Sequence, residues 1–337
     1  FRAGVNAGNS IASGGNYNTV VGDEAGTAIT TGDNNVAIGY VAGDAITTGS
    51  ESVALGSNSL SAATTSTKNT ALGAYALRND TLGSSSVAVG HQALNAQNFT
   101  SATAAYNVAV GANAGVAVTT GTNNTLIGGL AGDAITTGGN NTAVGSTALS
   151  ANTTAEGNAA VGARALEANT TGAYNSALGD GSLRTNTTAS SNTAVGQASL
   201  QNNTTGATNT ALGRNALQLN TTASNNTAVG YAALSTNTTA TNNTAVGSES
   251  LAANTSGAQN TAVGVSSMKA TTTGGDNTAL GFNSLVVNTT GTGNTALGRS
   301  TLDANTTASN NTAVGSNALG ANTTGASNTA TGRQALT

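Results

Sequence analysis

Cysteine, proline and tryptophan are absent from the sequence, and there is only one histidine. Without cysteine the chain has no disulfide framework and no thiolate metal site. Charged residues make up 7% and aromatic residues 3% of the chain, far less than in an ordinary globular domain. We therefore expect no single large core. The low charge and the lack of proline also argue against ordinary disorder.

The net charge and the lack of long apolar runs argue against two classes of partner. The formal net charge is -4, which provides no basic field for nucleic acid. No apolar run approaches the roughly 20 residues of a membrane-spanning helix. We expect neither nucleic-acid binding nor membrane insertion.

What the sequence does contain is one short phrase, repeated along its whole length. A triplet such as Ala-Val-Gly or Ala-Leu-Gly occurs 19 times, and its glycines follow one another at a constant 17-residue step, except for the 21-residue step from Gly90 to Gly111. This predicts one array over residues 1–337, with an irregular first coil at 1–21 and a four-residue insertion within 95–106. The repeat glycines include Gly39, Gly56, Gly73, Gly145, Gly196, Gly230 and Gly315.

Each repeat reads as a short strand followed by corners. The residue before the glycine is Val, Ile or Leu in every repeat but the last, and a Thr-Thr pair usually follows at the eighth and ninth positions after it. A β-branched run ended by glycine predicts a strand, and the fixed glycine suggests a positive φ or a close backbone approach. The fold prediction is an all-β parallel β-solenoid, or β-roll, of about 19 coils with one 17-residue repeat per coil.

Two columns of the repeat compensate for each other. Where the fourth residue after the glycine is Leu, as in Leu149, the seventh is usually Asn, as in Asn152. Where the fourth is Gly, as in Gly43, the seventh is Ile or Val, as in Ile46. One sizeable apolar side chain per coil is therefore expected to fill a thin core.

Neighbouring strand residues point to opposite faces, so the Val/Leu residue and the Ala before it cannot both face the core. We expect the Ala face to need cover from other chains, which predicts a homotrimeric fibre, or a longer filament. A monomeric solenoid with an Ala-rich outer face is the alternative. The Ala face contains Ala37, Ala54, Ala71, Ala88, Ala143 and Ala194.

The phrases "NNVAIGYVAGDAITTG" at 34–49, "YNVAVGANAG" and "NTAVGYAAL" resemble the head repeats of YadA-like trimeric autotransporter adhesins and repeats of marine bacteriophage tail fibres. The resemblance covers essentially the whole chain. It implies a left-handed parallel β-roll wound as a homotrimer for surface attachment. The longer repeat and the Asn-Thr-Thr segment depart from the adhesin pattern.

No constellation of residues predicts catalysis, a metal site or a cofactor. His91 occupies a variable position after the repeat glycine, where a solvated side chain is expected. The adjacent Asp23 and Glu24 lack the flanking pattern of a calcium loop. We expect no enzyme.

The two residues after each glycine form a candidate ligand stripe, because aromatic residues and arginine are favoured in binding patches. Two interpretations of these positions are open. They are either loop positions that tolerate any residue, or a surface that binds cell-surface glycans or receptors. The candidates are Tyr40, Tyr75, Tyr231, Phe282, Arg214 and Arg299, with Arg164 and Arg333 beside them.

A column of asparagines allows two interpretations. Facing inward, the side chains would stack as a hydrogen-bonded ladder. Facing outward, their Asn-Thr-Thr sequons would accept glycans. The column contains Asn152, Asn169, Asn186, Asn203, Asn220, Asn237, Asn254, Asn288, Asn305 and Asn322.

Three functions follow as hypotheses. The first is a structural and adhesive fibre shaft outside the cell, in a virion tail or on a microbial surface. The second is a densely N-glycosylated extracellular filament. The third, an ice-binding solenoid, is disfavoured because adjacent Thr-Thr residues make no paired Thr-x-Thr grid.

Overall fold

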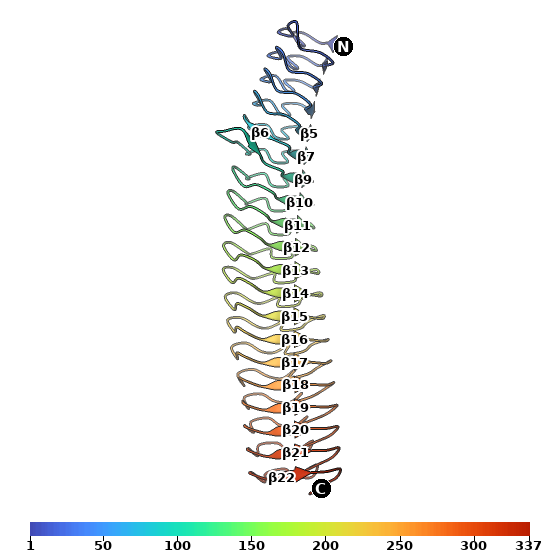
Figure 1. Cartoon of the computed structure of the whole chain (residues 1–337), viewed down its shortest axis with the longest axis vertical. Coiled ribbons are helices and arrows are strands. Elements are labelled where there is room, and N and C mark those ends of the chain that lie inside the picture. Colours follow the sequence, from blue (N-terminus) through green and yellow to red (C-terminus); the bar gives the residue numbers. More distant parts are fainter. The chain divides into compact units, whose positions relative to one another are not determined.

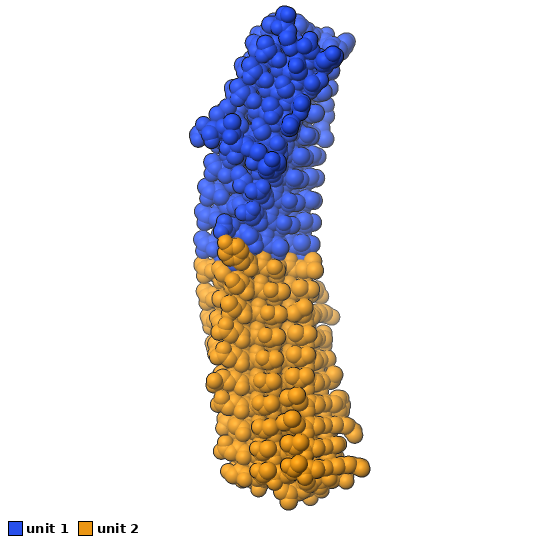
Figure 2. Space-filling model, in the orientation of Figure 1, with its two compact units in different colours: residues 1–173 blue, residues 174–337 orange.

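The computed structural model describes all residues from Phe1 to Thr337 and contains strands and turns but no helix. The chain divides into two compact units, Phe1–Ala173 and Tyr174–Thr337 (Figure 2). Each unit is a parallel β-solenoid with a 17-residue repeat, and the chain as a whole contains about 19 coils (Figure 1). The predicted fold class is confirmed.

Unit 1 contains one long ladder of parallel strands and one short side pair. The side pair consists of β6 (Gly83–Ser84) and β8 (Thr103–Ala104). The ladder consists of β1 (Arg2–Ala3), β2 (Thr19–Val21), β3 (Val36–Ile38), β4 (Val53–Leu55), β5 (Thr70–Leu72), β7 (Val87–Val89), β9 (Val108–Val110), β10 (Thr125–Ile127), β11 (Thr142–Val144) and β12 (Ala159–Val161).

Unit 2 is more regular and has a single ladder of three-residue strands. Its strands are β13 (Ser176–Leu178), β14 (Thr193–Val195), β15 (Thr210–Leu212), β16 (Thr227–Val229), β17 (Thr244–Val246), β18 (Thr261–Val263), β19 (Thr278–Leu280), β20 (Thr295–Leu297), β21 (Thr312–Val314) and β22 (Thr329–Thr331).

Register within the ladders is fixed by the repeat. Thr193 pairs with Thr210, Ala194 with Ala211, and Val195 with Leu212, and the same offset recurs along unit 2. Each residue type therefore stacks on its own kind, at the ordinary strand spacing of about 4.8 Å.

The expectation that the Ala face needs cover from other chains is wrong. Ala37, Ala54, Ala143 and Ala194, at the centres of their strands, are completely buried within their own coils. The residues on either side of each Ala point outward. The reason is volume: the interior of a coil this short also holds the large side chain of the fourth or seventh position, so most strands place only a methyl group inside it. Where glycine takes the fourth position, a larger strand residue fits, as the completely buried Val20 and Leu126 show.

The core is completed by one large side chain per coil, opposite the strand. Leu149 and Leu166 are completely buried and adopt φ values of 56° and 51°, in the left-handed region. Where glycine takes this position, the seventh residue fills the space: a Cβ on Gly43 would lie 3.0 Å from Cδ1 of Ile46. The expected exchange of volume between the fourth and seventh positions therefore has a direct geometric basis.

The irregular first coil is itself a degenerate repeat. Arg2 pairs with Val20 and Ala3 with Val21, so this coil is one residue longer than the regular ones. Gly4 has a φ of 132°, as the repeat glycines do, so it acts as a repeat glycine that the triplet pattern alone does not reveal.

The four-residue insertion enters the coil after Asn98. The hydroxyl of Thr81 still bonds to Asn98 at the regular offset, whereas Gly83 pairs with Thr103 and Val87 with Val108. Three of the four extra residues thus lie between Asn98 and Thr103 and the fourth between Ala104 and Val108, so the ladder pairing of β7 with β9 is kept. Phe99 is buried under this bulge.

Candidate functional site

The repeat glycines lie at the first corner after each strand, where coils approach most closely. Gly196 has a φ of 123°, and a Cβ there would lie 2.8 Å from the carbonyl oxygen of Gly213 in the next coil. No side chain fits in this space. Gly39, Gly56, Gly73, Gly145, Gly230 and Gly315 have φ values from 126° to 142° and similar contacts with the next coil's backbone.

The asparagines at the seventh position after the glycine point inward and form a ladder. Nδ2 of Asn220 donates to Oδ1 of Asn203 at 2.8 Å and to the carbonyl of Ala223 at 2.9 Å. Nδ2 of Asn237 donates to Oδ1 of Asn220 at 3.0 Å. Nine of the ten predicted positions are completely buried, and only Asn322, in the last coils, is partly exposed.

This burial bears on glycosylation. A glycan is attached through Nδ2, the atom that donates to the neighbouring coil and to the corner carbonyl. Attachment at Asn220 would replace one of the two amide hydrogens, so that at least one of those bonds is lost, and would require space that the core does not contain. The fold therefore favours the ladder over glycans at these positions.

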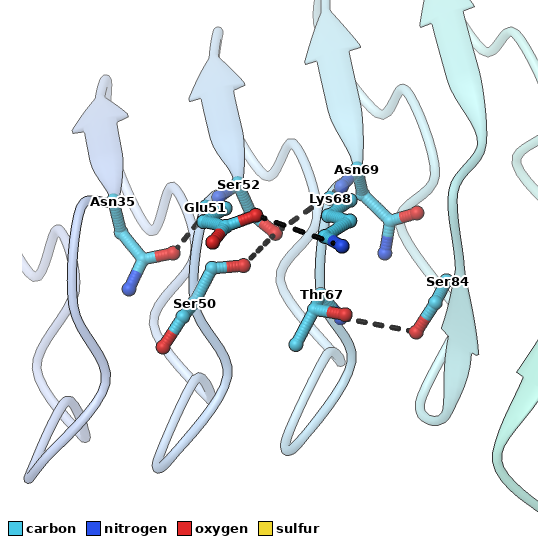
Figure 3. A network of polar contacts seen from close by, with 8 residues as sticks. All are labelled: Asn35, Ser50, Glu51, Ser52, Thr67, Lys68, Asn69 and Ser84. Atoms are coloured by element: carbon cyan, nitrogen blue, oxygen red, sulfur yellow. Dashed lines mark hydrogen bonds and ion pairs between the residues drawn. The ribbon is translucent and has the colours of Figure 1, made fainter.

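A second asparagine column, at the fourth position before the glycine, was not anticipated. Oδ1 of Asn35 accepts from the backbone N–H of Ser52 at 3.0 Å, and its Nδ2 donates to Gly49 at 2.8 Å. Ser52 bonds in turn to the N–H of Asn69 at 3.3 Å (Figure 3). The recurring "Asn-Thr-Ala-Val-Gly" phrase carried the signal, because this asparagine precedes most strands.

The insertion contains a buried carboxylate network. Asp80 and Gln97 occupy the ladder position in successive coils, and Nε2 of Gln97 donates to Oδ2 of Asp80 at 2.6 Å and to Ser86 at 3.0 Å. Asn107 donates to Oε1 of Gln97, and the N–H of Gly83 donates to Oδ1 of Asp80. Desolvation raises the pKa of Asp80 above its ordinary value, although these hydrogen bonds oppose the shift.

Two partly buried acids assemble no site. Asp44 and Asp133 each leave one carboxylate oxygen without a hydrogen-bond partner, and burial raises the pKa of both. No group of three or more His, Cys, Asp or Glu side chains is placed to hold a metal ion.

The candidate ligand stripe divides between the two units. In unit 1, Tyr40 is exposed, and the ring of Tyr75 makes an edge contact with His91, with centroids 6.0 Å apart. The guanidinium of Arg78 lies 5.2 Å from the Tyr75 ring centroid, close enough for a cation–π contact. Tyr75 and His91 therefore contact each other. Tyr75 is the second residue after its repeat glycine, whereas Tyr40 and His91 directly follow theirs.

In unit 2, the residues directly after the repeat glycine form a continuous column, here called the first-corner column. The exposed fractions are 50% for Tyr231, 47% for Val265 and 48% for Phe282. Over six consecutive coils the column contains Arg214, Tyr231, Ser248, Val265, Phe282 and Arg299.

A second exposed column lies on the strands themselves. The last residue of each ladder strand is Val, Leu or Ile in every coil except the first and the last, and the first residue of each strand in unit 2 is Thr in nine of ten strands. We call the face made by these two residues the outer sheet face. Its most exposed apolar members, at 36% to 49%, are Leu55, Leu72, Val110, Ile127, Leu178, Leu212, Val263, Leu280, Leu297 and Val314.

No protein-family model matches the sequence, and a search of curated proteins finds no match. The chain also contains no helix long and apolar enough to cross a membrane.

Proposed function

We propose that the chain is the shaft of a structural and adhesive fibre that assembles as a homotrimer. The observation that carries the proposal is the outer sheet face, which exposes an apolar side chain on almost every coil at the same phase. Soluble monomers rarely expose apolar patches of such length. A second and third copy of the same face would cover it.

The geometry of the face suits self-association. Each unit has ten consecutive strands, with two outward side chains on most of them. A stable interface buries about 800 Å² on each partner, and a face of this extent is of that order. Because no charged residue interrupts β13 to β22, assembly through this face would desolvate no charged group.

The proposed setting is extracellular, on a virion tail or a microbial surface. The resemblance to adhesin head repeats and phage tail-fibre repeats supports it. The structure of the coils also supports it. Hydrogen bonds of the backbone and of the asparagine ladder join each coil to the next, which suits a stiff spacer. The exposed corner residues would supply repeated contacts for surface glycans or receptors.

Native mass tests the assembly. Light scattering under non-denaturing conditions, with mass spectrometry of the denatured chain, should give three unmodified chains of 32.1 kDa. A native mass of one chain would contradict the trimer. A denatured mass well above 32.1 kDa would support the glycosylated filament instead.

One observation favours ice binding as a second candidate. The Thr-Thr pairs make no grid, but the strands of unit 2 present Thr-x-Val or Thr-x-Leu outward, in register over consecutive coils. This gives a regular array of hydroxyl and methyl groups. Since the same face cannot be exposed to ice and buried in a trimer, thermal hysteresis from a monomer would favour this function, and its absence would oppose it.

A further inference from the structure

The first-corner column of unit 2 is distinguished from the rest of the surface by its composition. Between Gly213 and Gly298 it reads Arg, Tyr, Ser, Val, Phe, Arg, so that an aromatic ring stands next to an arginine at each end. The equivalent positions in the last four coils of unit 1 are Ala112, Gly129, Ser146 and Ala163. Apart from Tyr40 and His91 in unit 1, large side chains directly after the repeat glycine are thus concentrated in unit 2.

The backbone holds these residues at the same phase. The carbonyl of Tyr231 accepts from the N–H of Glu249 at 2.8 Å, and that of Phe282 from Ser300 at 2.9 Å. The same bond recurs at Arg214, Ser248 and Val265. The side chains therefore leave a straight row of corners, and unit 2 presents such rows along its surface (Figure 2).

The spacing of the row follows from the strand spacing. Tyr231 and Phe282 are three coils apart, which separates their backbones by about 14 Å. Arg214 and Arg299 are five coils apart, or about 24 Å. An extended ligand that follows the row would meet one cation, two aromatic rings and a second cation in turn.

The two arginines are available to a ligand. Both are exposed, and neither guanidinium forms a hydrogen bond or ion pair within the chain. Glu249, the nearest carboxylate in sequence to the middle of the row, already pairs with Lys269 at 2.7 Å. An anion on the row therefore meets unpaired positive charge at its ends and a neutralised carboxylate at its centre.

We propose that the first-corner column from Arg214 to Arg299 binds a linear anionic polysaccharide lying along the coil axis. The apolar faces of sugar rings would pack on Tyr231 and Phe282, while the arginines bind carboxylate or sulfate groups. The inference rests on the proposed adhesive function and names its ligand class.

The alternative partners fit less well. Strands β14 to β20 are paired on both sides, which leaves no free edge to which an extended peptide could add. Two arginines in a chain of net charge -4 are too few for nucleic acid. Sugar chains need neither an edge nor a strong field, because they bind through ring stacking and a few charged groups.

Binding of defined polymers to the full chain tests the proposal. We would titrate alginate, which carries carboxylates, κ-carrageenan, which carries sulfates, and neutral dextran. At least one anionic polymer should bind, dextran should bind about tenfold more weakly or not at all, and added salt should weaken the binding. The stronger of the two anionic polymers identifies the preferred group. Equal binding of dextran, or no binding of either anionic polymer, overturns the proposal.

Variants locate the site. Arg214→Ser with Arg299→Ser, and separately Tyr231→Ser with Phe282→Ser, should each weaken binding by about tenfold. Tyr106→Ser, the same change at an exposed tyrosine of unit 1 that lies outside the ligand stripe, is the matched control and should leave binding unchanged. An equal loss in the control would overturn the assignment.

Two further readouts separate the possible failures. If polyglutamate binds as tightly as alginate, the row is a general anion surface and the polysaccharide assignment is wrong. Native mass is measured on every variant. A trimer that binds no polysaccharide contradicts only this inference, whereas a monomer that binds contradicts only the trimeric fibre.

Discussion

At the scale of single residues, the repeat glycine is the least replaceable position. Gly196→Ala would place a Cβ against the backbone of Gly213 and would force a φ of 123° on a residue with a side chain. We expect a loss of about 3 kcal/mol in the free energy of unfolding, measured by chemical denaturation. Gly129→Ala is the control, because a Cβ there meets nothing within 4 Å. Equal effects of the two substitutions would contradict this view of the corner.

The exchange between the fourth and seventh positions predicts a coupled pair. Leu149→Gly should cost about 4 kcal/mol through the cavity it leaves, and Asn152→Ile about 2 kcal/mol through overpacking against Leu149. The double variant reproduces the pattern of Gly132 and Ile135 one coil earlier. We expect it to be more stable than the sum of the single changes by about 2 kcal/mol in a double-mutant cycle. Simple additivity would contradict the shared volume.

Asp80 predicts a pH dependence of known sign. Because desolvation raises its pKa in the folded chain, folding favours the protonated form. Its contribution to stability is therefore largest below the ordinary aspartate pKa and is lost as the pH rises through the raised value. Melting temperatures across this range should fall more steeply for the native chain than for Asp80→Asn.

Exposed Asp276→Asn serves as the control and should keep the slope of the native chain. Asp44 and Asp133 also have raised pKa values and give a slope of the same sign, so the comparison is the difference between variants. Identical slopes for the native chain and Asp80→Asn would contradict the account of the buried carboxylate.

At the scale of the element, the asparagine ladder joins successive coils. Asn220→Ala removes the bonds to Asn203, Asn237 and Ala223 and leaves a cavity. A cost of about 2 kcal/mol is expected from denaturation curves. Thr222→Ala, on the exposed outside of the same coil, should change stability little. If the two costs are alike, the ladder does not stabilise the stack.

At the scale of the whole molecule, the outer sheet face predicts how assembly can be disrupted. Val195→Lys, Leu212→Lys and Val229→Lys together should reduce the native mass from three chains to one, because buried unpaired charges are costly. A control with lysine at Thr171, Thr188 and Thr205, which lie at an exposed corner, should remain trimeric. Dissociation of the control alone would place the interface at that corner instead.

The sequence by itself determined the coil, its length and its strands. If every coil is to be the same size, each residue must stack on the equivalent residue one repeat away. The repeat length in the sequence therefore equals the number of residues in one coil. The glycine at each corner was readable for the same reason, since no other residue tolerates that position in coil after coil. The first coil was predicted only as an irregular coil at 1–21, and Gly4 was not recognised as its repeat glycine, because the step from Gly4 to Gly22 is one residue longer than the regular repeat.

Only the tertiary structure decided which way the side chains face. The strand has two faces, and "Ala-Val-Gly" is compatible with either one inside. The small interior of the coil accommodates the alanine and leaves Val195 and Leu212 outside. The candidate interface is therefore the outer sheet face and not the Ala face. The sequon of Asn220 is compatible with either a glycan or a ladder, and burial favours the ladder, because the amide is enclosed by its own coil and the two neighbouring coils.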